Sequence, residues 1–502
     1  MANVFAGLGE KGRKLYLYEA DRETEFRQVL WGDWLSVDGE EPDGWLRIIW
    51  SPKINPKTVY IRKSDTQETR PLEIVFLDVG QGDGAVLITP ETGADEGVIV
   101  VDAGKGDNME RFLNGRFKAY RGFDFDSAVI THSDNDHYLG FGAIFANPKI
   151  GFKSIWQNGL VERPISGKWP KLGPSLPDPV SKITYFTELG ETYADVKSIL
   201  PNPAANAKFS YPKVLQGAID NPKVGQIAML SSEHGQIEDG RSYIPGYAPS
   251  TGRGYTIEVL GPVVERDGAG KARLRKIGDF GETKNGHSIL LRLSFGRFSV
   301  FFGGDLNEPA ERNLLMRYAG LDTYPRVGSP EYRMMVGKVA ERFRSEVMKV
   351  CHHGSEKVTD AFLEAVNPAC FIISSGDEEG HVHPRPDLLG RLGRAGRGAS
   401  PVLLSTELQR STREKADKAL IDDIAKATEK LAKAPTTAAL DAIKADLRKL
   451  AKTNVEVYGA IYLKTDGKRL ITAFKIEAAS DTDKWFYYEY VMTATGELVL
   501  ID

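Results

Sequence analysis

Short apolar runs that end directly in loops of Gly, Asp and His constrain the fold of this chain most. Such runs occupy residues 73–77, 97–101, 127–130, 298–302, 346–350 and 371–373. Because they are almost continuously apolar, they predict strands that are buried on both faces. Glycine allows the following loops to bend sharply, and aspartate favours turns, so each loop can present carboxylates at a strand end. The sequence therefore predicts an α/β fold with its chemically active residues at the ends of strands.

Composition narrows the class of protein. The 502 residues are 41% hydrophobic and 27% charged, which is enough apolar material for a large buried core. Lys and Arg number 65 against 69 Asp and Glu, so a basic coat over the whole surface is excluded and a polyanion would need a local patch. Two cysteines, Cys351 and Cys370, exclude a disulfide scaffold. No apolar run approaches the ~20 residues that span a bilayer, and we expect a cytoplasmic protein without membrane contact.

Three regions differ from the buried-strand pattern. Residues 1–70 hold short aromatic and β-branched runs, which predict a small β-rich module. Residues 71–502 are expected to form one large domain, in which 160–284 are rich in Pro, Gly and polar residues and predict a largely loop-rich insertion. Apolar residues recur at helical spacing in 410–453 on both sides of Pro435, which predicts a helical hairpin. The module and the hairpin are candidate docking sites for a protein partner.

Histidines and aspartates gather in the strand-end loops. The chain has eight histidines, and three close pairs account for six of them: His132 with His137, His352 with His353, and His381 with His383. Between the first two the sequence places Asp134 and Asp136, so four potential ligands lie within six residues. Without a cation these groups would repel or desolvate one another. Imidazole and carboxylate donors suit Zn or Mn, and the cluster predicts a metal site.

The order of the motifs resembles the metallo-β-lactamase fold and, more narrowly, the hydrolase domain of the competence protein ComEC. The resemblance covers roughly residues 72–476 and implies an αββα sandwich. It also implies that 410–453 is an insertion within this domain. The motifs that carry it are D-V-G-Q-G-D at 78–83, D-A-G at 102–104, H-x-D-x-D-H at 132–137, F-G-G-D at 302–305, H-H-G-S at 352–355, G-H-V-H-P at 380–384 and G-A-I at 459–461.

The resemblance implies a site for two divalent metal ions, Zn or Mn. Asp134 stands where the commoner family motif has a histidine, which exchanges an imidazole for a harder oxygen donor. The family's third motif normally supplies another histidine, for which Asn285 and His287 are the candidates here. The implied ligands are His132, Asp134 and His287 for the first ion, Asp136, His137 and His353 or its neighbour His352 for the second, and Asp305 bridging both.

The resemblance also implies roles around the ions. Asp136 and the pair His381 and His383 are expected to act in catalysis, the two histidines as proton donors to the leaving group. Ser355 and Arg385 are expected to contact a substrate phosphate. The residues expected to support the metal ligands are Asp78, Asp83, Asp102 and Asn285.

The function implied by the resemblance is hydrolysis of a phosphodiester, with DNA as the expected substrate and a metal-activated hydroxide as the nucleophile. Basic runs at 385–397 and 271–276 are compatible with contacts to nucleic-acid phosphates. Two alternatives stay open. The first is a hydrolase of a small ester, lactone or thioester, with 160–284 as the roof of a closed pocket. The second is a non-catalytic interaction scaffold, which would have lost metal ligands, whereas this chain retains them.

Overall fold

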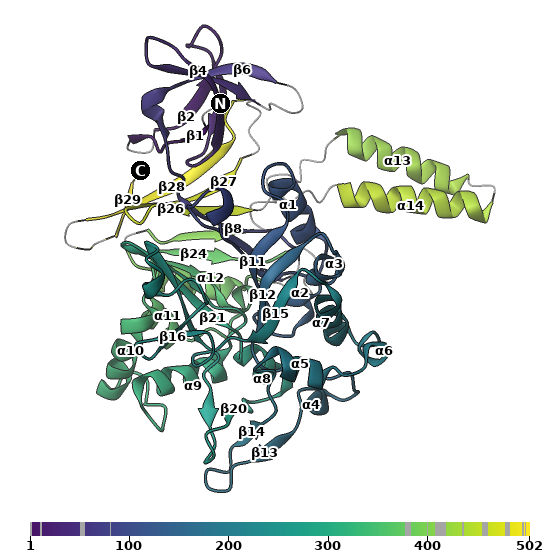
Figure 1. Cartoon of the computed structure of the whole chain (residues 1–502), viewed down its shortest axis with the longest axis vertical. Helices are drawn as coiled ribbons and strands as arrows, with labels where there is room; N and C mark the ends of the chain where they lie inside the picture. Colours follow the sequence, from purple (N-terminus) through teal and green to yellow (C-terminus); the bar gives the residue numbers. More distant parts are fainter. Residues whose placement is uncertain are drawn as a thin grey trace.

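The computed structural model describes residues 3–10, 13–50, 56–80, 82–376, 383–398, 400–406, 418–433, 436–453, 460–476, 482–493, 496 and 498–501. Two large sheets dominate this part of the chain (Figure 1). The strand order of the first sheet is β15 (Val224–Met229), β12 (Gly151–Gln157), β11 (Asp124–Val129), β10 (Val98–Ala103), β9 (Gly84–Ile88), β8 (Leu72–Phe76), β26 (Ile461–Thr465), β27 (Arg469–Lys475), β28 (Trp485–Met492) and β29 (Leu498–Ile501).

The second sheet has the order β16 (Gln236–Glu238), β17 (Arg241–Tyr243), β18 (Tyr255–Gly261), β21 (Leu290–Phe295), β22 (Phe298–Phe302), β23 (Val347–Lys349), β24 (Cys370–Ile373) and β25 (Val402–Ser405). In each sheet one half is parallel. Strands β10, β11, β12 and β15 run parallel in the first sheet, and β22 to β25 run parallel in the second. Their carboxyl ends therefore deliver loops to a common edge.

The main core lies between the two sheets. Strand β8 shows how the sequence builds it: Leu72, Ile74 and Phe76 face the second sheet, whereas Val75 faces the helices on the other side. The rings of Phe76 and Phe302 stack across the two sheets with their centroids 5.7 Å apart. Alternate residues of these strands are thus buried on opposite faces, which explains the continuous apolar runs.

Helices cover the outer faces of both sheets. Helices α1 (Asn108–Phe117), α3 (Phe141–Ala146) and α7 (Ser210–Asp220) pack on the first sheet. Helices α9 (Glu308–Ala319), α10 (Pro330–Phe343), α11 (Asp360–Val366) and α12 (Pro386–Ala395) pack on the second. The result is a helix–sheet–sheet–helix arrangement, and the predicted α/β class is confirmed.

Two of these helices begin at residues that favour helix starts. The side chain of Asn307 accepts a hydrogen bond from the backbone N–H of Ala310 at the start of α9. Ser329 does the same for Tyr332 at the start of α10, where Pro330 is the first helical residue. A side-chain cap followed by proline is a common N-terminal signal, because it satisfies free N–H groups and fixes φ.

The N-terminal residues form a separate sheet of short strands, with the order β3 (Glu25–Val29), β2 (Leu15–Tyr18), β6 (Lys57–Arg62), β5 (Trp45–Trp50), β4 (Trp34–Glu40), β1 (Asn3–Ala6) and β7 (Thr66–Gln67). Figure 1 shows it beside the end of the first sheet that carries β27 and β28. Leu30 and Trp31 pack against Ile471 and Ala473 there. The side-chain oxygen of Gln28 also accepts hydrogen bonds from the backbone N–H groups of 484 and 485.

Residues 160–284 differ from the expected loop-rich insertion. This range holds β15 of the first sheet, β16 to β18 of the second and a small sheet of β13 (Ser175–Pro177), β14 (Thr184–Phe186), β20 (Ala272–Arg275) and β19 (Glu265–Arg266). Its helices are α4 (Lys168–Lys171), α5 (Tyr193–Ile199), α6 (Pro203–Asn206), α7 and α8 (Phe280–Gly286). Most of these elements have three to seven residues, so Pro and Gly between them dominate the composition. A small apolar cluster that includes Leu172, Phe186 and Leu274 holds them together.

Two helices, α13 (Lys418–Ala432) and α14 (Thr437–Thr453), occur where the helical hairpin is predicted. They lie side by side and extend from the body of the molecule (Figure 1). Pro435, the predicted break between them, lies outside the described residues. None of the helices within the described ranges combines the length and apolarity needed to cross a membrane. The remaining helical turns are α2 (Asn135–Tyr138), η2 (Lys63–Asp65), η3 (Gly93–Asp95), η4 (Pro249–Thr251) and η5 (Cys351–Gly354).

Candidate metal centre

The loops after β8, β11, β22 and β23 meet at the common edge of the two sheets. Four residues from these loops, Asp83, His137, Asp305 and His353, offer potential ligand atoms that lie within 4.8 Å of one another, and all four residues are buried. Two of them follow strands of the first sheet, and two follow strands of the second. The edge predicted from the strand-end motifs is therefore the place where the structure concentrates its imidazoles and carboxylates.

Asp305 is the centre of this arrangement. Its Oδ1 atom lies 3.2 Å from His137 Nε2, and its Oδ2 atom lies 3.3 Å from His353 Nε2 and 3.9 Å from His132 Nε2. The carboxylate of Asp136 approaches the same group, with Oδ2 3.5 Å from His353 Nε2. We call His132, Asp136, His137, Asp305 and His353 the Asp305 cluster. Three Nε2 atoms that converge on carboxylate oxygens are a suitable donor set for a divalent metal.

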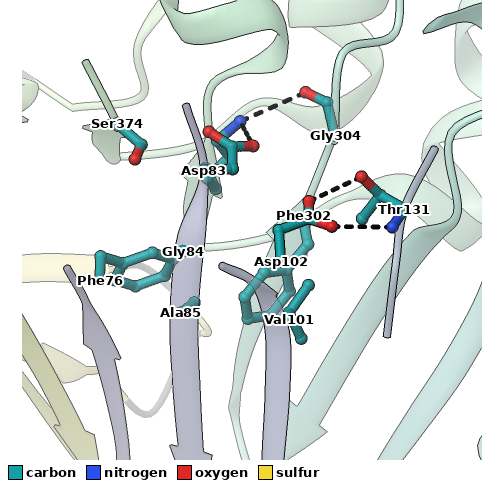
Figure 2. A pocket seen from close by; sticks show the side chains of 11 residues that line it. Phe76, Asp83, Gly84, Ala85, Val101, Asp102, Thr131, Phe302, Gly304 and Ser374 are labelled. Atoms are coloured by element: carbon teal, nitrogen blue, oxygen red, sulfur yellow. Dashed lines mark hydrogen bonds and ion pairs between the residues drawn. The ribbon is translucent and has the colours of Figure 1, made fainter. Parts of the chain in front are cut away.

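A buried carboxylate orients His137. Asp102, at the end of β10, places Oδ2 2.8 Å from His137 Nδ1. Asp102 is fixed in turn by Thr131, whose backbone N–H and hydroxyl donate to its two oxygens at 2.8 and 2.6 Å (Figure 2). When Nδ1 donates to a carboxylate, the lone pair of the ring lies on Nε2 and is available to a metal. The structure thus places Asp102 behind His137, on the side of the ring away from Asp305.

His353 is oriented in the same way from the other sheet. Its Nδ1 atom lies 3.1 Å from Asp83 Oδ1 and 3.1 Å from the carbonyl oxygen of Ser374. Asp83 also forms an ion pair with the buried ammonium of Lys349, which lies 3.3 Å from the Gly304 carbonyl oxygen. Because Asp83 is already paired with Lys349 and faces Nδ1 of His353, we assign it to orienting His353 rather than to holding an ion.

The loop that carries Asp83 approaches the H-x-D-x-D-H loop backbone to backbone. The N–H of Asp83 donates to the carbonyl oxygen of Asp136 at 3.2 Å. At Gly82, which has a φ of +114°, a Cβ atom would lie 1.8 Å from that same oxygen. Only glycine avoids this collision, so the G-D step of the D-V-G-Q-G-D motif has a direct structural reason.

The charges of the Asp305 cluster call for a cation. Burial lowers the pKa of His137 and of His353, but the surrounding carboxylates together outweigh it and raise both pKa values well above their ordinary value. These carboxylates are Asp305 with Asp102 for His137, and Asp305 with Asp83 and Asp136 for His353. The two Nε2 atoms of these histidines lie only 3.3 Å apart. The Nε2 atom of His132 is buried and has no hydrogen-bond partner among the described residues. A divalent cation would satisfy these nitrogens and release the protons, so the residues present fit a metal ion.

Asp134 belongs to a different group of charges. Its Oδ1 atom lies 2.5 Å from the ammonium nitrogen of Lys284, and that nitrogen lies 2.9 Å from Glu162 Oε1. Lys171 reaches Glu162 Oε2 at 3.0 Å. We call Asp134, Glu162, Lys171 and Lys284 the Lys284 network. Despite burial, contacts with His132 and Lys284 hold the pKa of Asp134 far below its ordinary value.

The structure does not bring His287 to the Asp305 cluster. The Nε2 atom of His287 lies 2.7 Å from the carbonyl oxygen of Arg275, a hydrogen bond that orients the ring toward the small sheet. Burial lowers the pKa of this histidine to about 4. The side chain of its neighbour Asn285 lies against Asp134. With the amide assigned so that its nitrogen faces the two acceptors, Asn285 donates to Asp134 Oδ2 at 2.8 Å and to the Gly281 carbonyl oxygen at 3.0 Å. Asn285 therefore contacts a predicted ligand, as expected for a supporting residue.

Other predicted residues lie around the rim. His352 has a side chain that is 26% exposed, and its Nε2 atom is 3.9 Å from Asp305 Oδ2. The ring of His383 is buried and lies 5.8 Å from the ring of His352, between centroids. His381 lies outside the described residues. His352 Nε2 thus approaches Asp305 as closely as His132 Nε2 does, although its side chain is more exposed, and His383 lies beside it.

Asp78, Ser355 and Arg385 occupy structural positions near the site. Asp78 Oδ1 accepts a hydrogen bond from the Gly80 N–H at 3.0 Å and so shapes the loop after β8. The backbone N–H of Ser355 donates to the carbonyl oxygen of His352 at 2.8 Å. The guanidinium of Arg385 is 3.8 Å from Glu356. The positions of Ser355 and Arg385 beside the histidine loop keep a substrate contact open as a prediction.

Two buried lysines of the site were not predicted from the sequence. Lys349 and Lys284 are buried and both pair with predicted site carboxylates. The signal for Lys349 was present in the sequence, because this lysine interrupts an apolar strand directly before the H-H-G-S loop. Lysine is almost never fully buried unless it is paired, so a lysine at that position indicates an acidic partner.

A cavity of about 510 Å³ opens beside the cluster. Residues 133–136, which include Asp134 and Asp136, and Tyr138 form one part of the lining, and residues of the 160–284 region form the rest. The basic residues that line it are Arg163, Lys171, Lys208 and Lys284, and the third acidic residue is Glu162. A substrate of small-molecule size, or the end of a larger one, can therefore reach Asp136 from this side.

Comparisons with known proteins give little further information. No family model and no curated protein matches the chain. Among solved structures, a mutant of the CmlA β-hydroxylase matches 68% of this chain with 12% identity and a TM-score of 0.29, and this chain spans only 54% of that protein. A protein of unknown function from Enterococcus faecalis matches 67% of this chain and 76% of its own length, with 9% identity and a TM-score of 0.22. Because both TM-scores are so low, neither match identifies the fold or the function of this chain.

Proposed function

We propose that this protein is a metal-dependent hydrolase of the metallo-β-lactamase fold, and that its reaction is cleavage of a phosphodiester. The observation that carries the proposal is the convergence of three histidine Nε2 atoms on Asp305, with His137 and His353 each oriented from behind by a buried carboxylate. The layers of the fold and the order of the strand-end motifs agree with this family, as the ComEC-like resemblance of the sequence implies.

Different residues of the site would bind the ion and orient the reacting groups. His137, His353 and Asp305 would hold the ion, with Asp136 and His132 beside them. A divalent cation held there, Zn or Mn, would lower the pKa of a water and neutralise charge on a phosphoryl oxygen. The sequence resemblance implies two such ions. Asp136 is the member of the Asp305 cluster that also contacts His353 and lines the cavity wall. It is therefore in a position to orient the attacking water.

Protonation of the leaving group is a task for the histidines of the rim. His352 and His383 lie next to each other at the edge of the Asp305 cluster. An imidazole titrates near neutral pH, and it can donate a proton to an alkoxide leaving group. We propose His383 for this role, together with His381 as the sequence motif implies.

DNA is the first substrate to test, and the support for it comes from the sequence motifs. The predicted basic runs contribute less than expected, because several of their arginines are paired. Arg391 contacts Asp360 at 2.7 Å, and Arg397 contacts Glu346 at 2.8 Å. Arg273 and Arg275 contact Asp178 and Glu265 at 2.9 and 2.8 Å.

The ion pairs of these arginines and the presence of the cavity favour a second candidate substrate, a small anionic phosphodiester. A volume of about 510 Å³ lies within the usual range of small-molecule pockets. The 160–284 region forms most of the cavity lining, as the alternative of a roofed pocket requires. The charge of the cavity separates this candidate from hydrolysis of a lactone or thioester only weakly, because four basic and three acidic side chains line it and Arg163, Lys171 and Lys284 are paired with carboxylates.

The test is hydrolysis by metal-stripped protein supplied with Mn²⁺ or Zn²⁺. Substrates are single-stranded, duplex and circular DNA, and bis(p-nitrophenyl) phosphate as a small phosphodiester. The Asp136→Ala, His137→Ala double variant is expected to lose all metal-dependent cleavage. His234→Ala is the matched control, since it removes a histidine that pairs with Glu191 at 3.0 Å outside the cluster.

The outcomes separate the candidates. Metal-dependent cleavage of DNA that disappears in the double variant supports the nuclease. Cleavage of the small diester alone supports the second candidate. Bound metal without cleavage of either substrate contradicts phosphodiester hydrolysis, and absence of both metal and cleavage leaves the interaction scaffold.

A further inference from the structure

Lys284 is a buried lysine placed beside the expected metal ligands. Its helix, α8, begins with a capping box in which Asp279 and Glu282 exchange hydrogen bonds between side chain and backbone. This cap fixes the helix, and the Lys284 side chain is only 7% exposed. Its ammonium contacts two carboxylates, those of Asp134 and Glu162, at 2.5 and 2.9 Å. A buried ammonium held by two carboxylates is a fixed positive charge.

Both oxygens of Asp134 are engaged in this arrangement. Oδ1 pairs with Lys284, and Oδ2 accepts the amide of Asn285 at 2.8 Å. His132 Nε2 is 3.8 Å from Oδ2, which is longer than a hydrogen bond. A metal ion that used Asp134 would have to coordinate a carboxylate whose charge Lys284 already balances.

The charges balance differently in the two groups. In the Lys284 network two ammonium groups, from Lys171 and Lys284, face the two carboxylates of Asp134 and Glu162. The network is therefore neutral without any ion. In the Asp305 cluster the carboxylates of Asp136 and Asp305 face only imidazoles. Because buried charge is unfavourable unless it is paired, these two carboxylates need two positive charges. No lysine or arginine of the described residues forms an ion pair with them, so the charges come either from protonated imidazoles or from one divalent ion.

The remaining ligand expected for a first ion is also engaged elsewhere. His287 directs Nε2 to the carbonyl oxygen of Arg275 at 2.7 Å. Its own carbonyl oxygen accepts a hydrogen bond from Asn158 Nδ2 at 3.0 Å, which anchors the backbone at this position. Of the three ligands expected for a first ion, only His132 has a nitrogen that faces the cluster without a hydrogen-bond partner among the described residues.

We infer that this chain holds a single divalent ion, in the Asp305 cluster, and that the ammonium of Lys284 occupies the electrostatic place of a second ion. The inference rests on the metal dependence of the proposed function. Lys284 lines the cavity together with Asp134 and Asp136. The cavity is thus bounded both by Asp136 of the ion site and by one fixed ammonium. An ammonium attracts an anionic oxygen as a point charge, but it does not lower the pKa of a water as a metal does.

The experiment counts Mn²⁺ in the full chain. Metal-stripped protein is titrated with Mn²⁺, bound metal is measured by equilibrium dialysis with elemental analysis, and the spectrum is recorded by electron paramagnetic resonance. Wild-type protein is expected to bind one Mn²⁺ per chain with the six-line spectrum of an isolated ion. Lys284→Met is expected to gain a second, weaker Mn²⁺ that is magnetically coupled to the first. Lys171→Met is the matched control, because it also removes a partner of Glu162 at 3.0 Å but leaves Asp134 paired, so it is expected to bind one ion.

A second variant keeps the test decisive if Lys284→Met does not fold. Asp134→Asn is expected to bind one Mn²⁺ with an affinity within about threefold of wild type. Two ions in the wild-type chain, loss of an ion in Asp134→Asn, or a Lys284→Met protein that folds and still binds one ion would each overturn the inference. A wild-type chain that binds no ion overturns the proposed function as well, so the two failures are distinguishable.

Discussion

Asp134 and Asp136 stand two residues apart in one loop, yet they belong to different electrostatic surroundings. Asp134 lies in the Lys284 network, where two ammonium groups balance two carboxylates. Asp136 lies in the Asp305 cluster, where two carboxylates face three imidazoles. A ligand motif therefore fixes only the type of donor atoms in a loop. Which of them remain available to an ion depends on charges from distant elements, here α8.

The largest effect is expected from Asp305→Asn. This change removes the carboxylate on which the three Nε2 atoms converge. Loss of a central charged ligand should weaken Mn²⁺ binding more than about 100-fold, since even loss of an orienting residue costs about 10- to 100-fold. Equilibrium dialysis measures the affinity, and Asp134→Asn provides the comparison from the other group. Equal losses in the two variants would show that the distinction between the groups is wrong.

The next effect concerns the buried pair of Lys349 and Asp83. Lys349→Met leaves the Asp83 carboxylate buried without its ammonium partner, which should lower the free energy of unfolding by about 3–5 kcal/mol. Urea denaturation of the metal-free protein measures it.

Lys153→Met is the control for that pair. It breaks the contact with Asp126 at 2.6 Å, but the lysine side chain is 78% exposed, so a loss below about 1 kcal/mol is expected. The Lys349→Met, Asp83→Asn double variant should recover much of the stability. A Lys349→Met protein as stable as wild type would mean that Asp83 does not need this partner.

Glu311 extends the comparison to a buried carboxyl group that forms no ion pair with any of the described residues. Its Oε2 accepts the N–H of Thr359 at 2.6 Å, and burial raises its pKa to about 8. Below pH 4.5 the Glu311 carboxyl is neutral in both the folded and the unfolded chain, so its ionisation does not change the free energy of unfolding there. Between about pH 4.5 and 8 it ionises only in the unfolded chain, so the free energy of unfolding falls as pH rises.

Glu311→Gln should remove this loss. We compare the free energy of unfolding of the variant with that of wild type at two pH values. The difference in favour of the variant is expected to be about 2–3 kcal/mol larger at pH 7 than at pH 5. Glu308→Gln, on the exposed side of the same helix, should show no such pH-dependent gain. Urea denaturation at the two pH values checks both, and parallel curves for Glu311→Gln and wild type would contradict the burial effect.

The smallest effect is expected from Asp102→Asn. The amide keeps an oxygen for Thr131 but weakens the contact that holds the proton on His137 Nδ1. Mn²⁺ affinity should fall about tenfold, with little change in the number of ions. A change in the count, measured by elemental analysis, would instead make Asp102 a ligand.

Much of the centre could be predicted from strand-end loops, because their position follows from local sequence. The runs that end at 78, 102, 132 and 305 do meet at one edge, and Asp102 and Asp83 do lie behind histidines. The side chains that come from α8 could not be predicted. Lys284 reaches Asp134 across 150 residues of sequence, and His287 is turned away by a single carbonyl oxygen on β20.

For the fold as well, only features with a strong local signal could be predicted. The continuous apolar strands were recognisable, since burial on both faces leaves a strong signal. The elements of 160–284 were not, because strands of three residues, such as β13 and β16, are too short for a periodic pattern. The arginines of the two basic runs were visible as charges, but their acidic partners Asp178, Glu265, Glu346 and Asp360 come from other elements.

The Asp305 cluster draws its donors from both sheets, with His137 after β11 in the first and His353 after β23 in the second. In the proposed hydrolase this has a consequence for synthesis on the ribosome. A nascent chain that has completed the first sheet's parallel strands still lacks Asp305 and His353, which come more than 160 residues after His137. The centre therefore forms only after the second sheet has docked, so the growing chain carries no finished site while it is being made.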